Sequence, residues 1–319
     1  MTDEAVLIGA LRSAAERSPL QLNGAFEADA ELVDVGKPEL LALNVDTLHA
    51  RSELVMCSSP YERGWLAVTA TLSDIAAVGA RPVAVLLSCS FAEASEDDAR
   101  ELGRGAADAA RAAGTHLVGG DTNWAGEDSI TGCALGFVER DRVMTRVGAK
   151  PGDVLYVTGP VGAGNAAGAR NMLGRDPQPW LPRARIESGR TIAARACIDT
   201  SDGLLSSALM LADVNDVGLE LRDAPEIYDR GGIELADELG LPSWMLAAAE
   251  WGEYELLYEL PPGGDPAGGI RVGRLLERGE CTIVCADGER VDARAASAAL
   301  RAVEPNASFA EDLLAVGAR

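Results

Sequence analysis

The chain has 319 residues, of which 47% are hydrophobic and 4% aromatic, so we expect a folded protein with two domains of ordinary size. A formal net charge of −22 argues against a nucleic-acid-binding protein, which would carry a basic stripe or patch. No apolar run approaches the roughly 20 residues of a membrane span, and the acidic N-terminus lacks a basic signal region, so a cytoplasmic protein is expected.

The first half of the chain alternates predicted helices and strands. An amphipathic helix is expected over residues 4–17, and an apolar strand over 40–45 that ends at Asp46. A helix should begin at Ser59-Pro60 and end at Gly79, because proline suits the first helical position. Further strands are predicted over 82–89, 116–118 and 129–138, with a helix between Ser95 and Gly114.

A turn-rich segment near residues 142–150 separates this block from a second one, so we place a domain boundary there. The second block begins with a strand over 154–158 and a glycine-rich turn that leads into a helix, 159–173. After these we expect a helix ending at Arg195, an apolar segment over 196–204, and strands near 217–221, 254–260 and 281–286.

Five aspartates lie where an ionised carboxylate is difficult to accommodate. Asp46 ends an apolar strand, Asp74 lies inside an apolar helix, and Asp121 follows a strand and two glycines. Asp199 and Asp202 follow another apolar segment. A buried carboxylate is costly unless it is paired or coordinates a metal. Together the five therefore predict a shared metal site.

An isolated aspartate usually caps a helix or forms a turn, and Asp202 could cap a helix over 204–212. The group as a whole favours Mg²⁺, because hard divalent cations prefer oxygen ligands. Several Mg²⁺ ions bound to a triphosphate would suit phosphoryl transfer, which needs positioning and charge neutralisation more than a catalytic base. His116, in an apolar strand, is interpreted as structural.

Residues 154–168 read as a strand, a glycine turn and a helix, which resembles a dinucleotide-binding fingerprint. The second strand and acidic residue of that fingerprint are missing from residues 170–185. A tight turn packed closely on a sheet is the preferred interpretation, and an NAD(P)-binding oxidoreductase is the rival. The sequence has no Walker phosphate loop, so ATP would be bound by another architecture.

Several stretches resemble the thiamine-monophosphate kinase family, within the PurM-like superfamily that includes aminoimidazole ribonucleotide synthetase. They are, in family order, 44–48, 67–82, 119–122, 145–153 and 198–204. The resemblance implies a two-domain α/β (α+β) PurM-like fold. An N-terminal domain, 1–145, would bind ATP and Mg²⁺ and join a dimeric β-barrel, and a C-terminal α/β domain would follow over 146–319. A homodimeric, ATP- and Mg²⁺-dependent kinase of a small molecule is the implied function.

The resemblance also implies roles for single residues. The metal ligands would be Asp29, Asp46, Asp74, Asp121, Asp199 and Asp202. The nucleotide would contact Gly120, Asp121, Arg146 and Ser201. The residues implied in catalysis are Asp74, Asp202 and Arg146. The acceptor would meet Glu53 and Glu253.

The sequence departs from the family pattern near the metal ligands and near the acceptor. Glu27-Ala28-Asp29 replaces G-D-D, Asn44-Val45 replaces S-T, and Glu53 stands where the family has a histidine. We hypothesise that the acceptor is not thiamine monophosphate, because Glu53 would disfavour an anionic phosphate. Two alternatives remain open: an ATP-dependent synthetase or cyclase with a phosphorylated intermediate, and a non-catalytic nucleotide-binding protein.

Overall fold

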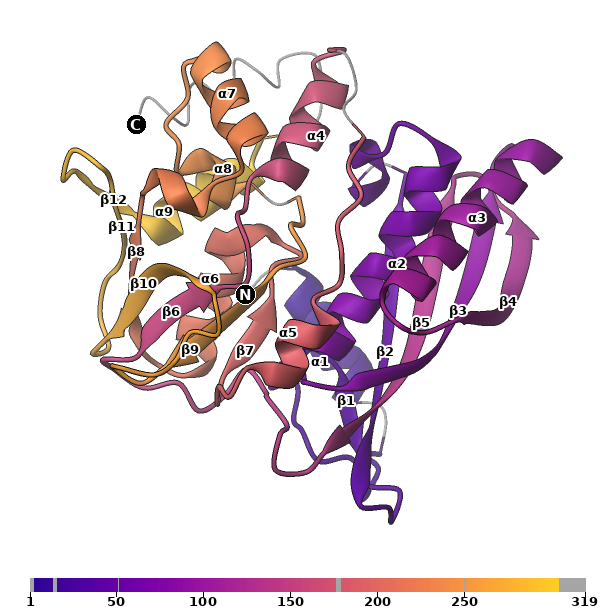
Figure 1. Cartoon of the computed structure of the whole chain (residues 1–319), viewed down its shortest axis with the longest axis horizontal. Coiled ribbons are helices and arrows are strands. Elements are labelled where there is room, and N and C mark those ends of the chain that lie inside the picture. Colours follow the sequence, from indigo (N-terminus) through magenta and orange to yellow (C-terminus); the bar gives the residue numbers. More distant parts are fainter. Residues whose placement is uncertain (1–2, 14–15, 51, 176–178, 250, 304–319) are drawn as a thin grey trace.

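The structure, a computed structural model, describes residues 3–13, 16–50, 52–175, 179–249 and 251–303. Two β-sheets with their helices form two neighbouring halves of the molecule (Figure 1). The first sheet has five strands in the order β1-β2-β5-β3-β4, and the second has seven in the order β12-β11-β8-β10-β6-β9-β7. Among the described residues, no helix combines the length and apolar character that crossing a bilayer requires.

The first sheet is antiparallel except at one edge, where β3 and β4 run parallel. Its longest strands pair over their whole length, with Asp46 of β2 opposite Gly132 of β5. The strands are β1 (Glu31–Val33), β2 (Glu39–His49), β3 (Arg81–Phe91), β4 (Leu117–Trp124) and β5 (Ser129–Glu139).

One face of this sheet is covered by α2 (Pro60–Ala77) and α3 (Glu96–Ala112). Ser59 caps α2 by accepting a hydrogen bond from the Glu62 amide, as the sequence predicted. The two helices pack backbone against backbone, since a Cβ on Gly64 would lie 2.0 Å from the Leu102 carbonyl oxygen. This close contact fixes α2, the helix that carries Asp74, against α3.

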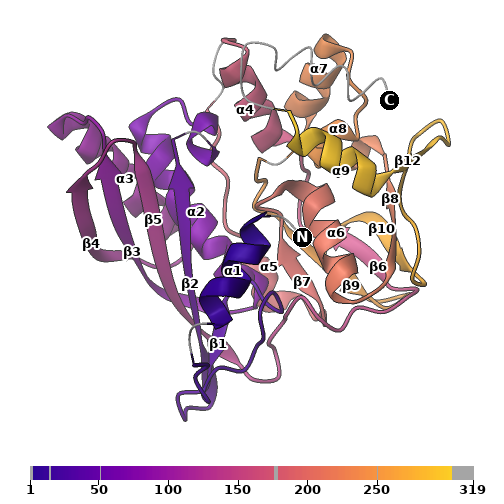
Figure 2. The same ribbon diagram turned by 180° about the vertical axis from the view of Figure 1, so that it is seen from behind.

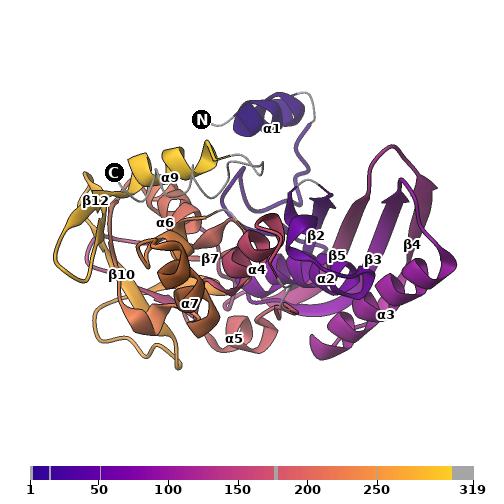
Figure 3. The ribbon, with the colours of Figure 1, turned by 90° about the horizontal axis from the view of Figure 1, so that it is seen from above.

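On the opposite face of the sheet, no described helix packs as α2 and α3 do (Figure 2). We call this the open face. Alternate residues of β2 are buried under α2, and the residues between them point to the open face. Val45 is 69% exposed there, and it shares a row with Cys133 and Leu86 of the adjoining strands. Helix α1 (Asp3–Ser13) lies on the same side of the molecule (Figure 3).

The second half of the chain builds a mixed sheet with helices packed beside it. Its strands are β6 (Val154–Val157), β7 (Cys197–Asp199), β8 (Gly218–Arg222), β9 (Leu256–Leu260), β10 (Ile270–Leu276), β11 (Cys281–Val284) and β12 (Arg290–Asp292). Its helices are α4 (Ala163–Met172), α5 (Ile186–Thr191), α6 (Gly203–Val214), α7 (Arg230–Leu239), α8 (Met245–Ala248) and α9 (Ala293–Arg301). Short 3₁₀ helices are η1 (Glu53–Met56) and η2 (Pro225–Ile227).

The two halves meet along α2. Tyr254, Leu256 and Tyr258 of the β9 region belong to the hydrophobic core that surrounds α2. The segment before α5 is also tied to this helix, because the indole of Trp65 donates a 2.5 Å hydrogen bond to the Pro182 carbonyl. As β7 pairs with β9, the end of β7 is brought beside α2.

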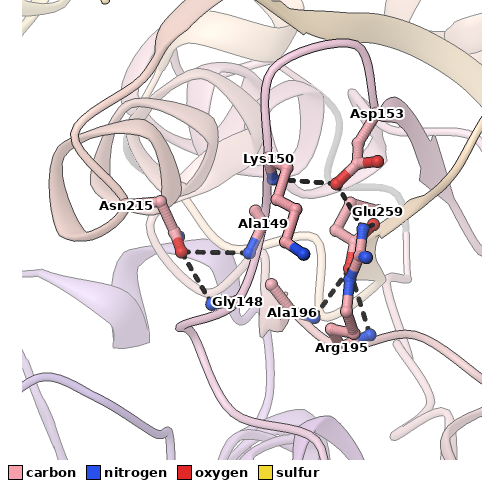
Figure 4. Close-up of polar contacts among 8 residues, drawn as sticks. All are labelled: Gly148, Ala149, Lys150, Asp153, Arg195, Ala196, Asn215 and Glu259. Atoms are coloured by element: carbon pink, nitrogen blue, oxygen red, sulfur yellow. Dashed lines mark hydrogen bonds and ion pairs between the residues drawn. The ribbon is translucent and has the colours of Figure 1, made fainter.

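A polar network fixes the turn that joins the halves (Figure 4). Asp153 accepts a hydrogen bond from the Lys150 amide at 2.8 Å and pairs with Arg195 at 2.5 Å. Arg195 also pairs with Glu259, whose side chain is fully buried. A buried carboxylate held by an arginine and backbone amides is satisfied, so this network stabilises the junction.

Several details differ from the sequence predictions. The predicted strand 116–118 runs on to Trp124, because Gly120 lets β4 approach β3 so closely that a Cβ would lie 1.6 Å from the Leu87 carbonyl oxygen. His116, interpreted as structural, lies just before β4 with an exposed side chain, and its carbonyl accepts a hydrogen bond from the Val85 amide at 3.1 Å. The helix expected to reach Arg195 ends at Thr191. Residues 14 and 15 of the predicted helix 4–17 lie outside the described residues.

Candidate active site

Three carboxylates from distant parts of the chain converge at the junction of the two halves. Asp29 precedes β1, Asp74 lies on α2, and Asp199 ends β7. Each offers an oxygen atom within 4.8 Å of the other two. Asp199 is 2% exposed, and the side chain of Asp29 is 1% exposed. We call Asp29, Asp74 and Asp199 the acid cluster.

The carboxylates of the acid cluster repel one another when they are ionised. Burial raises the pKa of Asp199 to about 7, and the negative charge of Asp29 acts in the same direction. Burial, followed by the charges of Asp199 and Asp29, raises the pKa of Asp74 well above its ordinary value. A hydrogen bond of 2.7 Å from the Asn44 amide to Asp74 opposes this shift. Like charges this close favour either protonation or a bound cation.

Unpaired oxygen atoms around the acid cluster fit a divalent cation. One carboxylate oxygen each of Asp29 and Asp199, the amide oxygen of Asn44 and the hydroxyl of Ser73 are buried without a hydrogen-bond partner in the described structure. Buried polar atoms normally have partners. Because all four atoms are oxygens and two are carboxylate oxygens, the donor set suits a hard cation such as Mg²⁺.

Arg146 brings a positive charge to the acid cluster. Its guanidinium Nη2 and Nε lie 2.8 and 3.3 Å from Oδ1 of Asp29. Its Nη1 lies 3.2 Å from the Met210 sulfur on α6. Burial would lower the pKa of Arg146, but the neighbouring carboxylates, led by Asp29, raise it, so the side chain stays charged. Arg146 thus offsets part of the negative charge.

Asp46, Asp202 and Glu53 form a second group of carboxylates, which is linked to the acid cluster through Asp46. Burial raises the pKa of Asp46, and the charges of Glu53 and Asp202 add to the effect. Asp46 also raises the pKa of Asp74. The Glu53 carboxylate accepts a hydrogen bond from the His49 amide at 2.9 Å. Five of the six aspartates predicted as metal ligands therefore lie in one region.

The loop between β7 and α6 holds two more predicted residues. The hydroxyl of Ser201 donates a 2.7 Å hydrogen bond to Asp199. Asp202 occupies the N-cap position of α6, as the sequence suggested, but its side chain makes no capping hydrogen bond. Gly203 has a φ of +79°, and a Cβ there would lie 2.2 Å from the Ala249 carbonyl oxygen. Glycine is needed for this sharp turn.

Asp121 and Gly120 do not join this region within one chain. Asp121 lies on the outer strand β4 and is in register with Ser88 of β3, so both side chains point to the open face of the sheet. Asp46 points to the face covered by α2. Three strand spacings also separate β4 from β2, about 14 Å. The exposed Asp121 instead accepts a hydrogen bond from Asn123 at 2.7 Å.

Glu253 occupies the N-terminus of α4. Its carboxylate accepts hydrogen bonds from the amides of Gly164 and Asn165 at 3.0 and 3.2 Å, and burial raises its pKa to about 7. A dinucleotide pyrophosphate would need the same amides. A Cβ on Gly164 would lie 2.2 Å from the Gly252 carbonyl oxygen. The glycines therefore serve close packing, as the preferred interpretation held, and the oxidoreductase rival loses its binding site.

A cavity of about 290 Å³ opens beside this buried carboxylate. Its polar lining includes Arg185, which pairs with Glu255. The other lining residues that carry charge or an aromatic ring are Trp180, Arg183, Asp229 and Glu253.

The sequence did not indicate some residues of the site. Asn44 was noted only as a departure from the family pattern, yet it donates to Asp74. Met210 and Asn215 contact Arg146 or its loop, and neither residue type suggests such a role from its position in the sequence. A contact between a helix end and a distant loop has no signature in a single sequence.

Comparisons with known proteins agree on fold and family. Residues 27–138 match the family model described as AIR synthase related protein, N-terminal domain. The chain is 32% identical over 290 residues to the thiamine-monophosphate kinase of Halobacterium salinarum, covering 87% of this chain and 96% of that protein. A crystal structure of thiamine-monophosphate kinase from Stenotrophomonas maltophilia superposes with a TM-score of 0.69 at 26% identity, covering 91% and 98% of the two chains.

A fourth comparison supports the fold alone. The structure of AaThiL complexed with AMPPCP and TMP superposes with a TM-score of 0.78 at 24% identity, covering 91% of this chain and 94% of that one. The two-domain PurM-like α/β fold implied by the sequence resemblance is confirmed.

Proposed function

The chain belongs to the thiamine-monophosphate kinase family, and from this premise we propose that it transfers the terminal phosphoryl group of ATP to a small molecule with the help of Mg²⁺. The acid cluster carries the proposal. Its three carboxylates lie within 4.8 Å of one another and leave buried oxygens without partners. AMPPCP, the ligand of the AaThiL complex, is an ATP analogue, which supports ATP as the phosphoryl donor.

Asp29, Asp74 and Asp199 are proposed to hold divalent cations, with Asp46 and Asp202 beside them. Bound Mg²⁺ would neutralise charge on the triphosphate. Arg146 holds Asp29 in place and adds a fixed positive charge close to the phosphates. Ser201 orients Asp199 through its hydroxyl. No histidine lies among these residues. Phosphoryl transfer depends mainly on positioning and charge neutralisation and does not require a strong base.

Our proposal for the acceptor depends on the negative charge of Glu53. Similar proteins are named thiamine-monophosphate kinases, so thiamine monophosphate is the first acceptor to test. Glu53 lies close enough to Asp46 for its charge to raise the pKa of that carboxyl group. An acceptor phosphate would meet this negative charge. We therefore propose that an acceptor with a cationic or hydroxyl-bearing group is preferred to thiamine monophosphate.

The open face of the five-stranded sheet supports a homodimer. It exposes Val45 and Leu86, and a monomer would leave this apolar surface in water. We propose that a second chain covers it, which would place both copies of Asp121 at the interface. A metal-binding or nucleotide-binding role for Asp121 and Gly120 is proposed only in such a dimer.

ATP turnover by the purified protein tests the proposal. Product formation is followed by ³¹P NMR with ATP, Mg²⁺ and thiamine monophosphate, and then with a panel of alcohols and amines. We expect turnover that stops when EDTA is added. Absence of ATP consumption with every acceptor would favour the non-catalytic alternative, and release of phosphate together with ring closure would favour the synthetase. NAD(P) should leave the melting temperature unchanged, whereas ATP with Mg²⁺ should raise it.

A further inference from the structure

Asn215, at the C-terminal end of α6, uses its whole side chain to hold the loop that carries Arg146. Its Nδ2 donates to the Arg146 and Leu211 carbonyls, each at 2.8 Å. Its Oδ1 accepts from the amides of Gly148 and Ala149, at 2.7 and 3.0 Å. Figure 4 shows the latter two bonds. The two amide hydrogens and two carbonyl lone pairs of an asparagine are thus all used.

The same helix reaches Arg146 from a second position. Met210, one turn before the end of α6, lies 3.2 Å from Nη1 of Arg146. At its other end, α6 begins directly after Asp199 and Asp202. The helix therefore connects the loop with two predicted metal ligands to the loop with Arg146, and Asn215 forms the hydrogen-bonded end of this connection.

We propose that Asn215 is a positioning residue, which fixes the backbone of residues 146–149 so that the Arg146 guanidinium meets Asp29 in one orientation. The positioning role of Asn215 rests on the proposed kinase function only in the experiments that measure activity. A loop without these bonds would let the guanidinium move relative to the acid cluster. Since small misplacements reduce catalysis strongly, loss of Asn215 should be felt at the reaction centre.

A double-mutant cycle tests whether Asn215 acts through Arg146. Asn215→Ala should lower kcat/KM about tenfold in the native background, and less than about twofold when Arg146 is already alanine. An equal loss in both backgrounds would overturn the proposal, because a merely structural role would persist without Arg146. Where Arg146→Ala does not fold, Arg146→Lys takes its place in the cycle.

Hydrogen exchange gives a readout that does not depend on activity. In Asn215→Ala, the amides of Gly148 and Ala149 should exchange at least about tenfold faster, while those of β6 keep their protection. Asp292→Ala is the matched control, since it also removes two hydrogen bonds to backbone amides, at the start of α9, and should leave residues 146–149 unchanged. Unchanged exchange at 148 and 149 would overturn the proposal. Faster exchange in a protein without kinase activity would instead refute the proposed function and keep the positioning role.

Discussion

Asp46 and Asp121 project from opposite faces of the same five-stranded sheet. Asp46 lies on the face covered by α2, close to Asp74, and Asp121 shares the open face with Ser88. No rotation of a side chain brings both to one cation within a single chain, because the sheet lies between them. A site shared by Asp46 and Asp121 therefore needs a second chain packed on the open face, as the proposed homodimer supplies.

A charge on the open face should therefore prevent dimer formation. Val45→Arg places a guanidinium at one end of the row that Val45 forms with Cys133 and Leu86 on the open face. We expect a dimer for the native protein and a monomer for the variant by analytical ultracentrifugation, because burying an unpaired charge is costly. Ala112→Arg, an exposed position on α3 across the sheet, is the control and should remain dimeric. A native protein that sediments as a monomer would contradict the proposed interface.

Removing one charge from the acid cluster should raise the stability of the protein and lower its activity. Asp74→Asn keeps a side-chain oxygen for the Asn44 hydrogen bond and removes repulsion with Asp29 and Asp199. In EDTA we expect the variant to be more stable than the native protein by about 1–2 kcal/mol in urea unfolding. ATP turnover should fall by a factor on the order of 100 or more.

The effect of magnesium on the melting temperature should distinguish this variant from the native protein. It should raise the melting temperature of the native protein more than that of Asp74→Asn, because the variant has lost one anionic ligand. Asp97→Asn, an exposed position on α3, changes the net charge equally and should respond to magnesium as the native protein does. Equal magnesium responses in all three proteins would show that the acid cluster does not bind the ion.

Changing Glu53 should alter the choice of acceptor. Glu53→Gln removes the negative charge near Asp46 but keeps an oxygen for the His49 amide. We expect kcat/KM for thiamine monophosphate to rise about threefold to tenfold, because an anionic acceptor then meets less repulsion. The KM for ATP should stay nearly constant. A native protein that already prefers thiamine monophosphate, with no gain in the variant, would refute the altered acceptor.

The sequence predicted the parts of the site that lie close to recognisable patterns. The cap at Ser59 and the helix with Asp74 both follow from local rules. No local rule predicts that Asp29 meets Asp199, and only the family resemblance implied it, because 170 positions along the chain separate them and the packing of β9 on α2 helps to bring them together. In the same way, the opposite orientation of Asp121 depends on the register between β3 and β4, which a glycine-rich stretch does not reveal.

The buried Glu253 should give the protein a specific dependence of stability on pH. Its folded-state pKa of about 7 lies above the ordinary value of 4.5. Between these pH values the folded protein keeps a proton that the unfolded chain has lost, so stability falls as pH rises through the window and then levels off. One pKa unit corresponds to about 1.4 kcal/mol.

Glu253→Gln removes this contribution, although its single side-chain oxygen can replace only one of the two carboxylate oxygens that accept from the amides of Gly164 and Asn165. Between pH 5 and pH 8 the variant should gain about 1–3 kcal/mol of stability relative to the native protein, as measured by urea unfolding at each pH. Glu289→Gln, an exposed position, should differ from the native protein by the same small amount at every pH. Because both variants lose one carboxylate, only burial at the start of α4 accounts for a difference that grows with pH.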